Sequence, residues 1–344
     1  MDARVFFRLV NGPFGDPALY LRLPHQPDAL LFDCGDLHPL APRACLKVRR
    51  VFISHAHIDH LAGFDQLLRL SLYRDLCLQL YGPPGLVAQI DHRLRGYSWK
   101  LLENFPFVLR VTEWSERLGR CAQFSAARAF ALEELPPVDQ QDGWLCRGRD
   151  DRISALPFDH GGVLSLGFRF EQRQQVVIDV VALQRFGLLA GPWLGNFKRL
   201  LREQAPGDTL LQAPLADGGV RDYRLDELSG EIARSRAGVK VCYVTDLQPT
   251  ETNLDRVVSL ARGVDLLVIE APFLHRDVER ARKRNHLTAH LAGEAAGRAG
   301  VGRLLVFHHS PRYQDQPRAL WREAERARRE AAAAGRMNPE TSGV

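Results

Sequence analysis

The sequence predicts an α/β fold in which two mixed β-sheets pack against each other and are flanked by helices. Strand-like runs alternate with helical ones in two rough halves, which suits a sheet-on-sheet sandwich. The His-rich segment Ser54–His60 separates an apolar run (51–53) from an amphipathic run (61–72), so we place it on the turn between a strand and a helix. A later apolar run (239–244) ends in Thr245-Asp246 in the same way. Open α/β sheets place their sites at such strand ends.

Composition sets broad limits on the function. The chain has 344 residues, 45% hydrophobic and 25% charged, as in soluble globular proteins of one or two domains. The net charge of +5 is compatible with RNA as a partner, and equally with a mildly basic enzyme that binds no nucleic acid. Six scattered cysteines without a Cys-x-x-Cys pair indicate reduced thiols and a cytoplasmic protein. No window reaches the length of a membrane span, so we expect no membrane partner.

The first half of the chain is the more regular. Alternating residues in 5–9 and 18–23 predict a hairpin, because Asn-Gly-Pro and Gly-Asp-Pro turn signals lie between them. Apolar runs predict further strands at 29–32, 47–53 and 76–81. Helical spacing predicts helices at 61–72 and 86–95. Residues 97–150 suggest only a weak meander.

In the second half, apolar strands alternate with helices, and two of these strands, 239–244 and 264–269, are expected to be buried. We predict a strand at 163–170, a long connection over 182–240, and strands at 239–244, 264–269 and 303–307. The basic run 276–284 is expected to be a solvated helix face. A helix should open at His286 and run to Ala299, where Gly300 is a stop signal. Residues 314–344 are expected to form a C-terminal basic helix and a flexible tail.

The His-rich segment predicts a metal site. Imidazole nitrogens and carboxylate oxygens are ligands that Zn²⁺ prefers. On an extended turn His55 and His57 project to one side, while Asp59 and His60 reach a second ion. One short segment can therefore serve two metals. The alternative is a chance His-rich surface loop, which the flanking strand and helix disfavour.

Single residues elsewhere can complete this site. His160 lies just before a predicted strand and beside glycines that let backbone approach closely. Asp246 follows a buried strand, although it could instead cap the next helix. His308 and His309 are adjacent on an extended segment and point to opposite faces, so at most one faces the site.

Together these motifs resemble the metallo-β-lactamase superfamily, and more narrowly ribonuclease Z, the tRNA 3′-processing endonuclease. The resemblance covers residues 3–313, and its segments occur in the family's order. They are Leu31–Asp36, His55–His60, Asp159-His160, Tyr243–Asp246, Asp265–Ala271, His286-x-Thr288-Ala289 and His308–Tyr313. It implies an αββα metallohydrolase domain over 1–313, in which 182–240 matches part of the family's arm region.

The resemblance also implies a chemistry: a dinuclear zinc phosphodiesterase, with manganese as an alternative metal, that hydrolyses RNA in tRNA 3′-end processing by a metal-bridged hydroxide. It assigns catalysis to Asp59, to His286 as the proton donor to the leaving oxygen, and to Glu270 as a carboxylate that orients it. His286 could instead be a helix-start residue that bonds the backbone. The implied metal ligands are His55, His57 and His160 for one ion, Asp59, His60 and His308 for the other, and Asp246 as a bridge. The implied substrate contacts are Ser310, Arg312 and Lys198.

Some positions depart from the family pattern. Ile58, Ile269, and the neighbours of Asp246 differ from its usual residues. The family also carries a Gly/Pro- and Arg-rich arm after its third metal motif, whereas residues 170–186 lack such a run, so we expect a shortened or missing arm. Three hypotheses remain: a ribonuclease Z-type enzyme acting on tRNA precursors, a hydrolase of a small phosphodiester such as a cyclic nucleotide, and a catalytically weak binding or regulatory module. The resemblance implies a homodimer.

Overall fold

The computed structural model describes residues 5–24, 26–100, 102 and 104–337. The chain divides into two compact units: Met1–Glu171 with Val239–Val344, and Gln172–Gly238. Across those described ranges, no helix is long and apolar enough to cross a membrane. The expected tail at 338–344 lies outside the described residues.

The structure contains the predicted strands and helices in order, together with others that the sequence did not predict. The strands are β1 (Phe6–Leu9), β2 (Leu19–Arg22), β3 (Ala29–Phe32), β4 (Val48–Phe52), β5 (Cys77–Gly82), β6 (Val108–Glu113), β7 (Leu118–Ser125), β8 (Leu132–Asp139), β9 (Trp144–Arg147), β10 (Asp151–His160), β11 (Val163–Gln172), β12 (Gln175–Ile178), β13 (Leu210–Pro214), β14 (Val220–Arg224), β15 (Ala233–Arg236), β16 (Lys240–Val244), β17 (Leu266–Glu270) and β18 (Arg303–Phe307). The α-helices are α1 (Pro42–Cys45), α2 (Ile58–Leu61), α3 (Phe64–Ser71), α4 (Leu86–Arg95), α5 (Val180–Arg185), α6 (Trp193–Arg202), α7 (Leu225–Ile232), α8 (Glu251–Ala261), α9 (Val278–Lys283), α10 (Ala289–Arg298) and α11 (Ala319–Met337).

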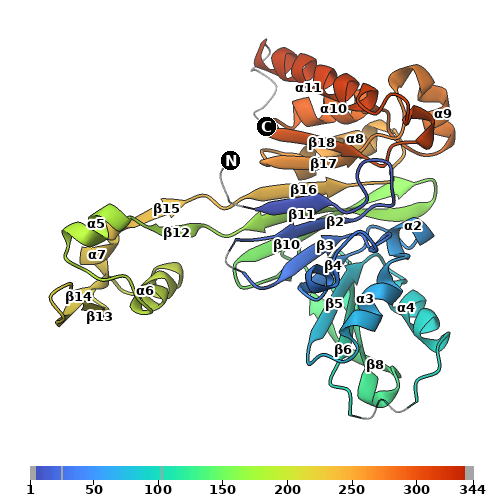
Figure 1. Cartoon of the computed structure of the whole chain (residues 1–344). Helices are drawn as coiled ribbons and strands as arrows, with labels where there is room; N and C mark the ends of the chain where they lie inside the picture. Colours follow the sequence, from blue (N-terminus) through green and yellow to red (C-terminus); the bar gives the residue numbers. More distant parts are fainter. Residues whose placement is uncertain (1–4, 25, 101, 103, 338–344) are drawn as a thin grey trace. The chain divides into compact units, whose positions relative to one another are not determined.

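The larger unit is the predicted sandwich (Figure 1). One sheet has eight strands in the order β1 to β8, and the other has six in the order β18-β17-β16-β11-β10-β9. Helices α3 and α4 lie against the first sheet, and α8, α10 and α11 against the second. The apolar side chains accordingly form a core on the outer face of each sheet and a third core between the sheets.

Side-chain alternation along β3 shows how the layers arise. All four residues of β3 are buried, because both faces of the strand are covered. Leu31 points into the core beneath the helices, while Phe32 points between the sheets. There Phe32 stacks on Phe52 of its own sheet and on Tyr243 of the other sheet, with ring centroids 5.1 and 5.7 Å apart. The aromatic contacts join the two halves of the chain.

Parallel pairing brings the strand ends to one edge of the sandwich. Strands β3 to β6 run parallel in one sheet, and β16 to β18 run parallel in the other. Asp33, Asp246 and His308 follow three of these strands, and all three have positive φ angles, 54°, 49° and 58°. Such backbone strain in non-glycine residues concentrates at functional sites. We therefore expect a functional site at this edge of the sandwich.

The smaller unit corrects one expectation. Residues 182–240 were expected to be a long connection, but Gln172–Gly238 has a core of its own, in which Phe197, Leu228 and Ile232 are fully buried. Strands β12 and β15 pair with each other, as do β13 and β14, and helices α5 to α7 complete the unit. The sequence did not predict a separate unit here, because the core residues of this unit are spread over many short elements.

Other differences are local. The amphipathic run 61–72 forms α2 and α3, which are separated at Gly63, rather than one helix. The described part of 97–150 forms strands β6 to β9 rather than a weak meander. The helix expected to open at His286 begins at Ala289, because the Thr288 hydroxyl accepts a hydrogen bond from the Leu291 amide and caps it. His286 is thus left on the preceding loop.

Candidate metal centre

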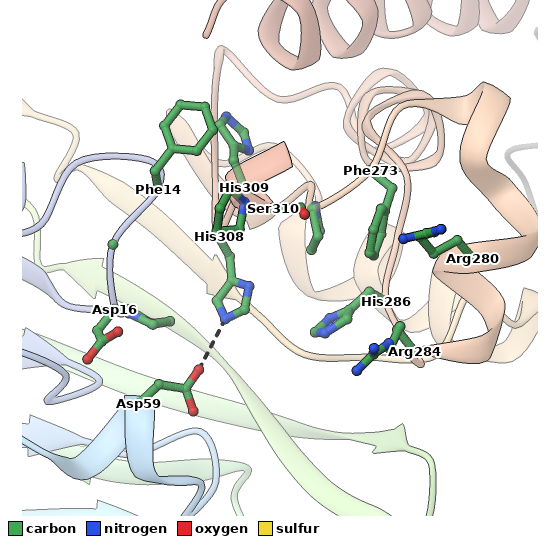
Figure 2. Close-up of a pocket in the computed structure, with 14 residues that line it drawn as sticks. Phe14, Asp16, Asp59, Phe273, Arg280, Arg284, His286, His308, His309 and Ser310 are labelled. Atoms are coloured by element: carbon green, nitrogen blue, oxygen red, sulfur yellow. Dashed lines mark ion pairs between the residues drawn. The ribbon is translucent and has the colours of Figure 1, made fainter. Parts of the chain in front are cut away.

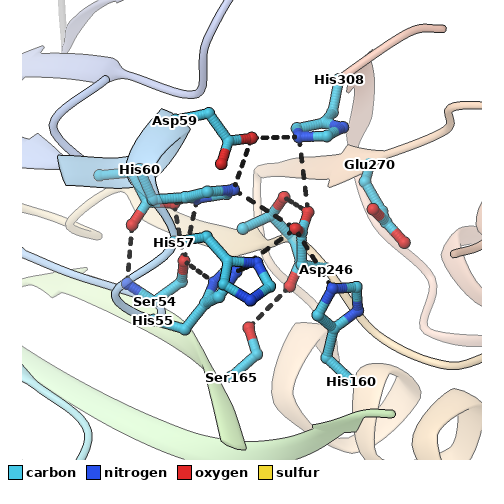
Figure 3. Close-up of polar contacts among 12 residues, drawn as sticks. Ser54, His55, His57, Asp59, His60, His160, Ser165, Asp246, Glu270 and His308 are labelled. Atoms are coloured by element: carbon cyan, nitrogen blue, oxygen red, sulfur yellow. Dashed lines mark hydrogen bonds and ion pairs between the residues drawn. The ribbon is translucent and has the colours of Figure 1, made fainter. Parts of the chain in front are cut away.

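The predicted ligands come from both halves of the chain and meet at the edge described above (Figure 3). His55, His57, Asp59 and His60 occupy the turn between β4 and the end of α2. His160 lies just before β11, as expected, and it is also the last residue of β10, which brings it to the site. A Cβ on Gly35 would lie 2.5 Å from the Asp59 carbonyl oxygen, so glycine is needed where the loop after β3 meets this turn.

The ligand atoms form two groups that share one carboxylate. His55, His57, His160 and Asp246 each present a ligand atom within 4.8 Å of the others, and so do Asp59, His60 and His308. The Asp246 oxygens lie 3.3–3.7 Å from imidazole nitrogens of both groups, at His60, His55, His308 and His160. Two ligands of a tetrahedral zinc, each ~2.0–2.2 Å from the ion, lie about 3.3–3.6 Å apart. The residues present therefore fit two cations bridged by Asp246.

An unpaired buried nitrogen supports this fit. Nε2 of His60 is fully buried and has no hydrogen-bond partner among the described residues, although it lies 3.5 Å from Asp59 and 3.3 Å from Asp246. A buried polar atom of this kind is costly unless something else satisfies it. Nδ1 of His60 donates to Asp33, and Nδ1 of His160 donates to the Asn285 carbonyl, so in both rings Nε2 is left to face the site.

The charges around the centre favour a positive ion. Burial, followed by the neighbouring His60, lowers the pKa of His55 to about 3, so His55 is neutral and can act as a ligand. Burial also disfavours a charged His60, but Asp246 and Asp33 outweigh it and raise the His60 pKa well above its ordinary value. Burial would raise the pKa of Asp246, yet His308 and His60 hold it well below its usual range. Carboxylates that raise a buried histidine pKa would equally stabilise a metal ion.

Asp33 supports the ligands from behind, a role that the sequence did not reveal. Its carboxylate accepts hydrogen bonds from the Ser54 amide (2.7 Å), the Ser54 hydroxyl (2.9 Å), His60 Nδ1 (2.9 Å) and the Tyr243 hydroxyl (2.8 Å). Tyr243 belongs to the other sheet, so this one carboxylate ties both sheets to a ligand. The sequence signals were its place at the end of an apolar strand and within the family-like segment Leu31–Asp36, and neither indicated this role.

We expect Asp33→Asn to weaken metal binding ~10–100-fold, the range for lost outer-sphere partners of metal ligands. An amide nitrogen at this position cannot accept the bonds that two carboxylate oxygens now share, so His60 loses its orientation. Competition with a chromophoric chelator measures the affinity. Asp36→Asn is the matched control, because the Asp36 side chain is partly exposed and, among the residues that the structure describes, bonds only His38. Equal affinities in the two variants would contradict this role.

The departures from the family pattern are accommodated locally. Ile58 begins α2 and is exposed, so its side chain does not crowd the ligands. Ile269 is fully buried in the core under α8 and α10. The Thr245 hydroxyl donates to Asp246 Oδ1 at 2.9 Å and thereby orients the bridging carboxylate. None of the three removes a ligand.

His286 and Glu270 form a pair beside the ligands. Nδ1 of His286 donates to Glu270 Oε2 at 2.8 Å, and Glu270 Oε1 accepts the Leu287 amide at 2.9 Å. Burial disfavours the charged imidazole, but Glu270 outweighs it and raises the His286 pKa to about 9. His286, Glu270, Asp246 and His308 each have a ligand-type atom within 4.8 Å of the others. His286 therefore offers a protonated Nε2 next to the centre.

A pocket of about 330 Å³ adjoins the centre (Figure 2). Its lining includes Asp59, His286 and His308 from the site, together with Ser310, one of the three predicted substrate contacts. Arg312 does not line it and pairs instead with Asp277 at 3.3 Å. Lys198 lies on α6 of the smaller unit.

Two pocket residues escaped the sequence analysis. Arg280 and Arg284 belong to the basic run that was expected to be a solvated helix face, yet both line the pocket. The run contains four arginines and one lysine in nine positions, so composition alone could not show which of them faced a site. The nearby His309 points away from the centre, as one of two adjacent histidines must, and donates to the Ala271 carbonyl at 2.9 Å.

Solved structures share this fold. Human tRNase Z, short form, has a TM-score of 0.53 and 19% identity, covering 90% of this chain and 93% of that one. YhfI from Bacillus subtilis, a metallo-β-lactamase fold protein, has a TM-score of 0.53 and 15% identity over 94% of this chain and 91% of its own. Identities this low show the fold alone, and they confirm the predicted metallo-β-lactamase sandwich.

Comparison with curated protein sequences identifies the family, although no protein-family model matches the chain. The ribonuclease Z of Deinococcus radiodurans is 31% identical over 302 residues, which are 87% of this chain and 86% of that protein. The ribonuclease Z of Prochlorococcus marinus (strain MIT 9303) is 32% identical over 321 residues, 90% of this chain and 86% of its own. The match spans nearly the whole length of both relatives and agrees with the metal-ligand geometry. The chain therefore belongs to the ribonuclease Z family.

Proposed function

We propose that this protein is a dinuclear zinc endoribonuclease that cleaves a phosphodiester of tRNA precursors at their 3′ end. The observation that carries the proposal is the pair of ligand groups joined through Asp246, beside a histidine that Glu270 holds as a proton donor. Imidazole and carboxylate ligands suit zinc, with manganese as the alternative. Bound ions would activate water at neutral pH and bind the phosphate oxygens.

The proposed ligands are those named from the sequence: His55, His57 and His160; Asp59, His60 and His308; and Asp246 between them. Family membership and the Glu270–His286 pair support general acid catalysis by His286. Its Nδ1–H is engaged by Glu270, so the proton it can deliver is on Nε2. At neutral pH the raised pKa keeps that proton in place until the 3′ oxygen leaves.

We further propose that the smaller unit, Gln172–Gly238, is this chain's counterpart of the family's arm. It occupies the place after the third metal motif, and it has its own core. The charge of this unit is nearly balanced, with nine lysines and arginines against eight aspartates and glutamates. We therefore expect it to bind tRNA through few phosphate contacts. Lys198 on α6 is one candidate contact. A homodimer and a cytoplasmic location remain predictions.

Deleting this unit should separate RNA recognition from chemistry. Glu171 of β11 pairs with Lys240 of β16, so a short Gly/Ser linker can replace residues 172–238 across an antiparallel pair. The three cores of the larger unit contain none of the deleted residues. We expect cleavage of precursor tRNA to fall at least ~10-fold while hydrolysis of bis(p-nitrophenyl) phosphate is kept, because remote contacts serve the large substrate only. Equal losses on both substrates would contradict the assignment.

The proposed function is tested with two substrates side by side on zinc-loaded protein: bis(p-nitrophenyl) phosphate and a precursor tRNA with a 3′ trailer. Hydrolysis of both, with the tRNA cut after the discriminator nucleotide, supports tRNA 3′ processing. Hydrolysis of the small diester alone would move the chain to the small-phosphodiester hypothesis. Hydrolysis of neither would leave the binding-module hypothesis.

A further inference from the structure

The pocket beside the metal centre has one acidic wall and one basic wall. Figure 2 shows Asp16 and Asp59 on one side, Arg280 and Arg284 on the other, and His308 and His286 between them. Its volume of about 330 Å³ is near the lower end of small-ligand sites, so it suits a single nucleotide rather than a duplex. The metal-ligand residues therefore lie at one end of the pocket and the two arginines at the other, with His286 between them.

The two arginines differ from their neighbours on the same segment. Arg282 pairs with Glu279 at 2.7 Å, and Arg276 lies 3.8 Å from Asp277. The guanidinium groups of Arg280 and Arg284 have no hydrogen bond or ion pair with any residue that the structure describes. Arg280 lies in α9 and Arg284 directly follows it, and because both line the same pocket, their like charges repel each other. An anion between them would relieve that repulsion.

The position of His286 in the pocket indicates which anion the two arginines would bind. If His286 protonates the leaving 3′ oxygen, then the nucleotide that carries this oxygen must lie in the pocket beside it. The next charged group on that nucleotide is its own 5′ phosphate, one position upstream of the cut. Guanidinium groups bind phosphate through paired, charge-assisted hydrogen bonds.

We propose that Arg280 and Arg284 form a subsite for the phosphate immediately upstream of the scissile one, so that the enzyme prefers RNA with two consecutive phosphates to an isolated diester. This inference rests on the proposed function, because it takes the scissile bond to lie at the metal centre. The inference goes beyond that function because it assigns substrate specificity to Arg280 and Arg284 and says which phosphate of the RNA they bind.

Three dinucleotides test the subsite on the zinc-loaded full chain: ApA, pApA with a 5′ phosphate, and ApAp with a 3′ phosphate. We expect kcat/KM to be ~10–100-fold higher for pApA than for ApA, the range for hydrogen bonds between charged groups. In Arg280→Ala/Arg284→Ala this ratio should fall to about one. Arg282→Ala is the matched control, an exposed arginine on the same helix outside the pocket, and it should keep the wild-type ratio.

A binding measurement gives a readout apart from turnover. Calorimetry with the methylphosphonate analogue of ApA, with and without a 5′ phosphate, should show the same phosphate-dependent gain in the wild type and its loss in the double variant. Equal ratios in wild type and double variant, an equal loss in Arg282→Ala, or a gain for ApAp instead of pApA would each overturn the subsite. If the wild type hydrolyses no diester but the calorimetric gain depends on the arginines, the proposed function fails, while the two arginines are still shown to bind the 5′ phosphate.

Discussion

Asp246→Ala is expected to remove metal and activity together. Among the described residues, Asp246 is the one carboxylate within 3.7 Å of imidazole nitrogens from both ligand groups, so its loss takes a ligand from each ion. Metal ions contribute several kcal/mol of transition-state stabilisation, which corresponds to a rate loss of ~10³-fold or more. Metal analysis of the purified protein, together with hydrolysis of bis(p-nitrophenyl) phosphate, measures both effects.

The matched control for this variant is Asp255→Ala. Asp255 is exposed on α8, pairs with Arg298 at 2.5 Å and belongs to none of the ligand groups, so its removal should change neither metal content nor rate. Two metals per chain in Asp246→Ala would show that the carboxylate does not bridge. One metal per chain would assign Asp246 to a single ion.

His286→Ala is expected to keep both metals and slow turnover. The loss of a general acid costs ~10²–10⁴-fold in rate. The effect should be largest on RNA, whose 3′ alkoxide is a poor leaving group, and smaller on bis(p-nitrophenyl) phosphate, whose phenolate needs little protonation. Metal analysis and kcat for each substrate distinguish this from a ligand role. Loss of metal in the variant would instead make His286 a ligand or a support.

The pH profile supplies an independent check on His286. An acid works in its protonated form, so the rate should fall as pH rises through the His286 pKa, which Glu270 raises to about 9 despite burial. Glu270→Gln keeps the shape of the side chain but removes the charge. The His286 pKa should therefore fall, and the alkaline limb should move to lower pH. An unchanged limb in Glu270→Gln would show that another group sets it.

Much of this site could be predicted because its residues mark the ends of strands. An apolar run followed by a polar, metal-ligating side chain is a local pattern, and it recurs at β4, β16 and β18. Since the carboxyl ends of parallel strands share one edge, the pattern implied a common site before the pairing was known. The order of the motifs then indicated the family.

Other features depended on the tertiary structure. Asp33 orients His60 and bonds Tyr243, 210 positions further along the chain, and no local pattern encodes that distance. Arg280, in α9, and Arg284, directly after it, differ from the other basic residues of this segment only because they line the pocket.

The smaller unit shows the same division between local and distant information. Its strands and helices are short, and what makes Gln172–Gly238 a unit is a core of side chains distant in sequence, such as Phe197 and Ile232.

The sequence by itself determined which groups this protein can bring to a metal and which fold carries them, because hydrophobic periodicity and strand-end chemistry are local. Only the tertiary structure decided which of them are oriented by a buried partner and which basic residues face the pocket, because these depend on the pairing of strands and the packing of layers.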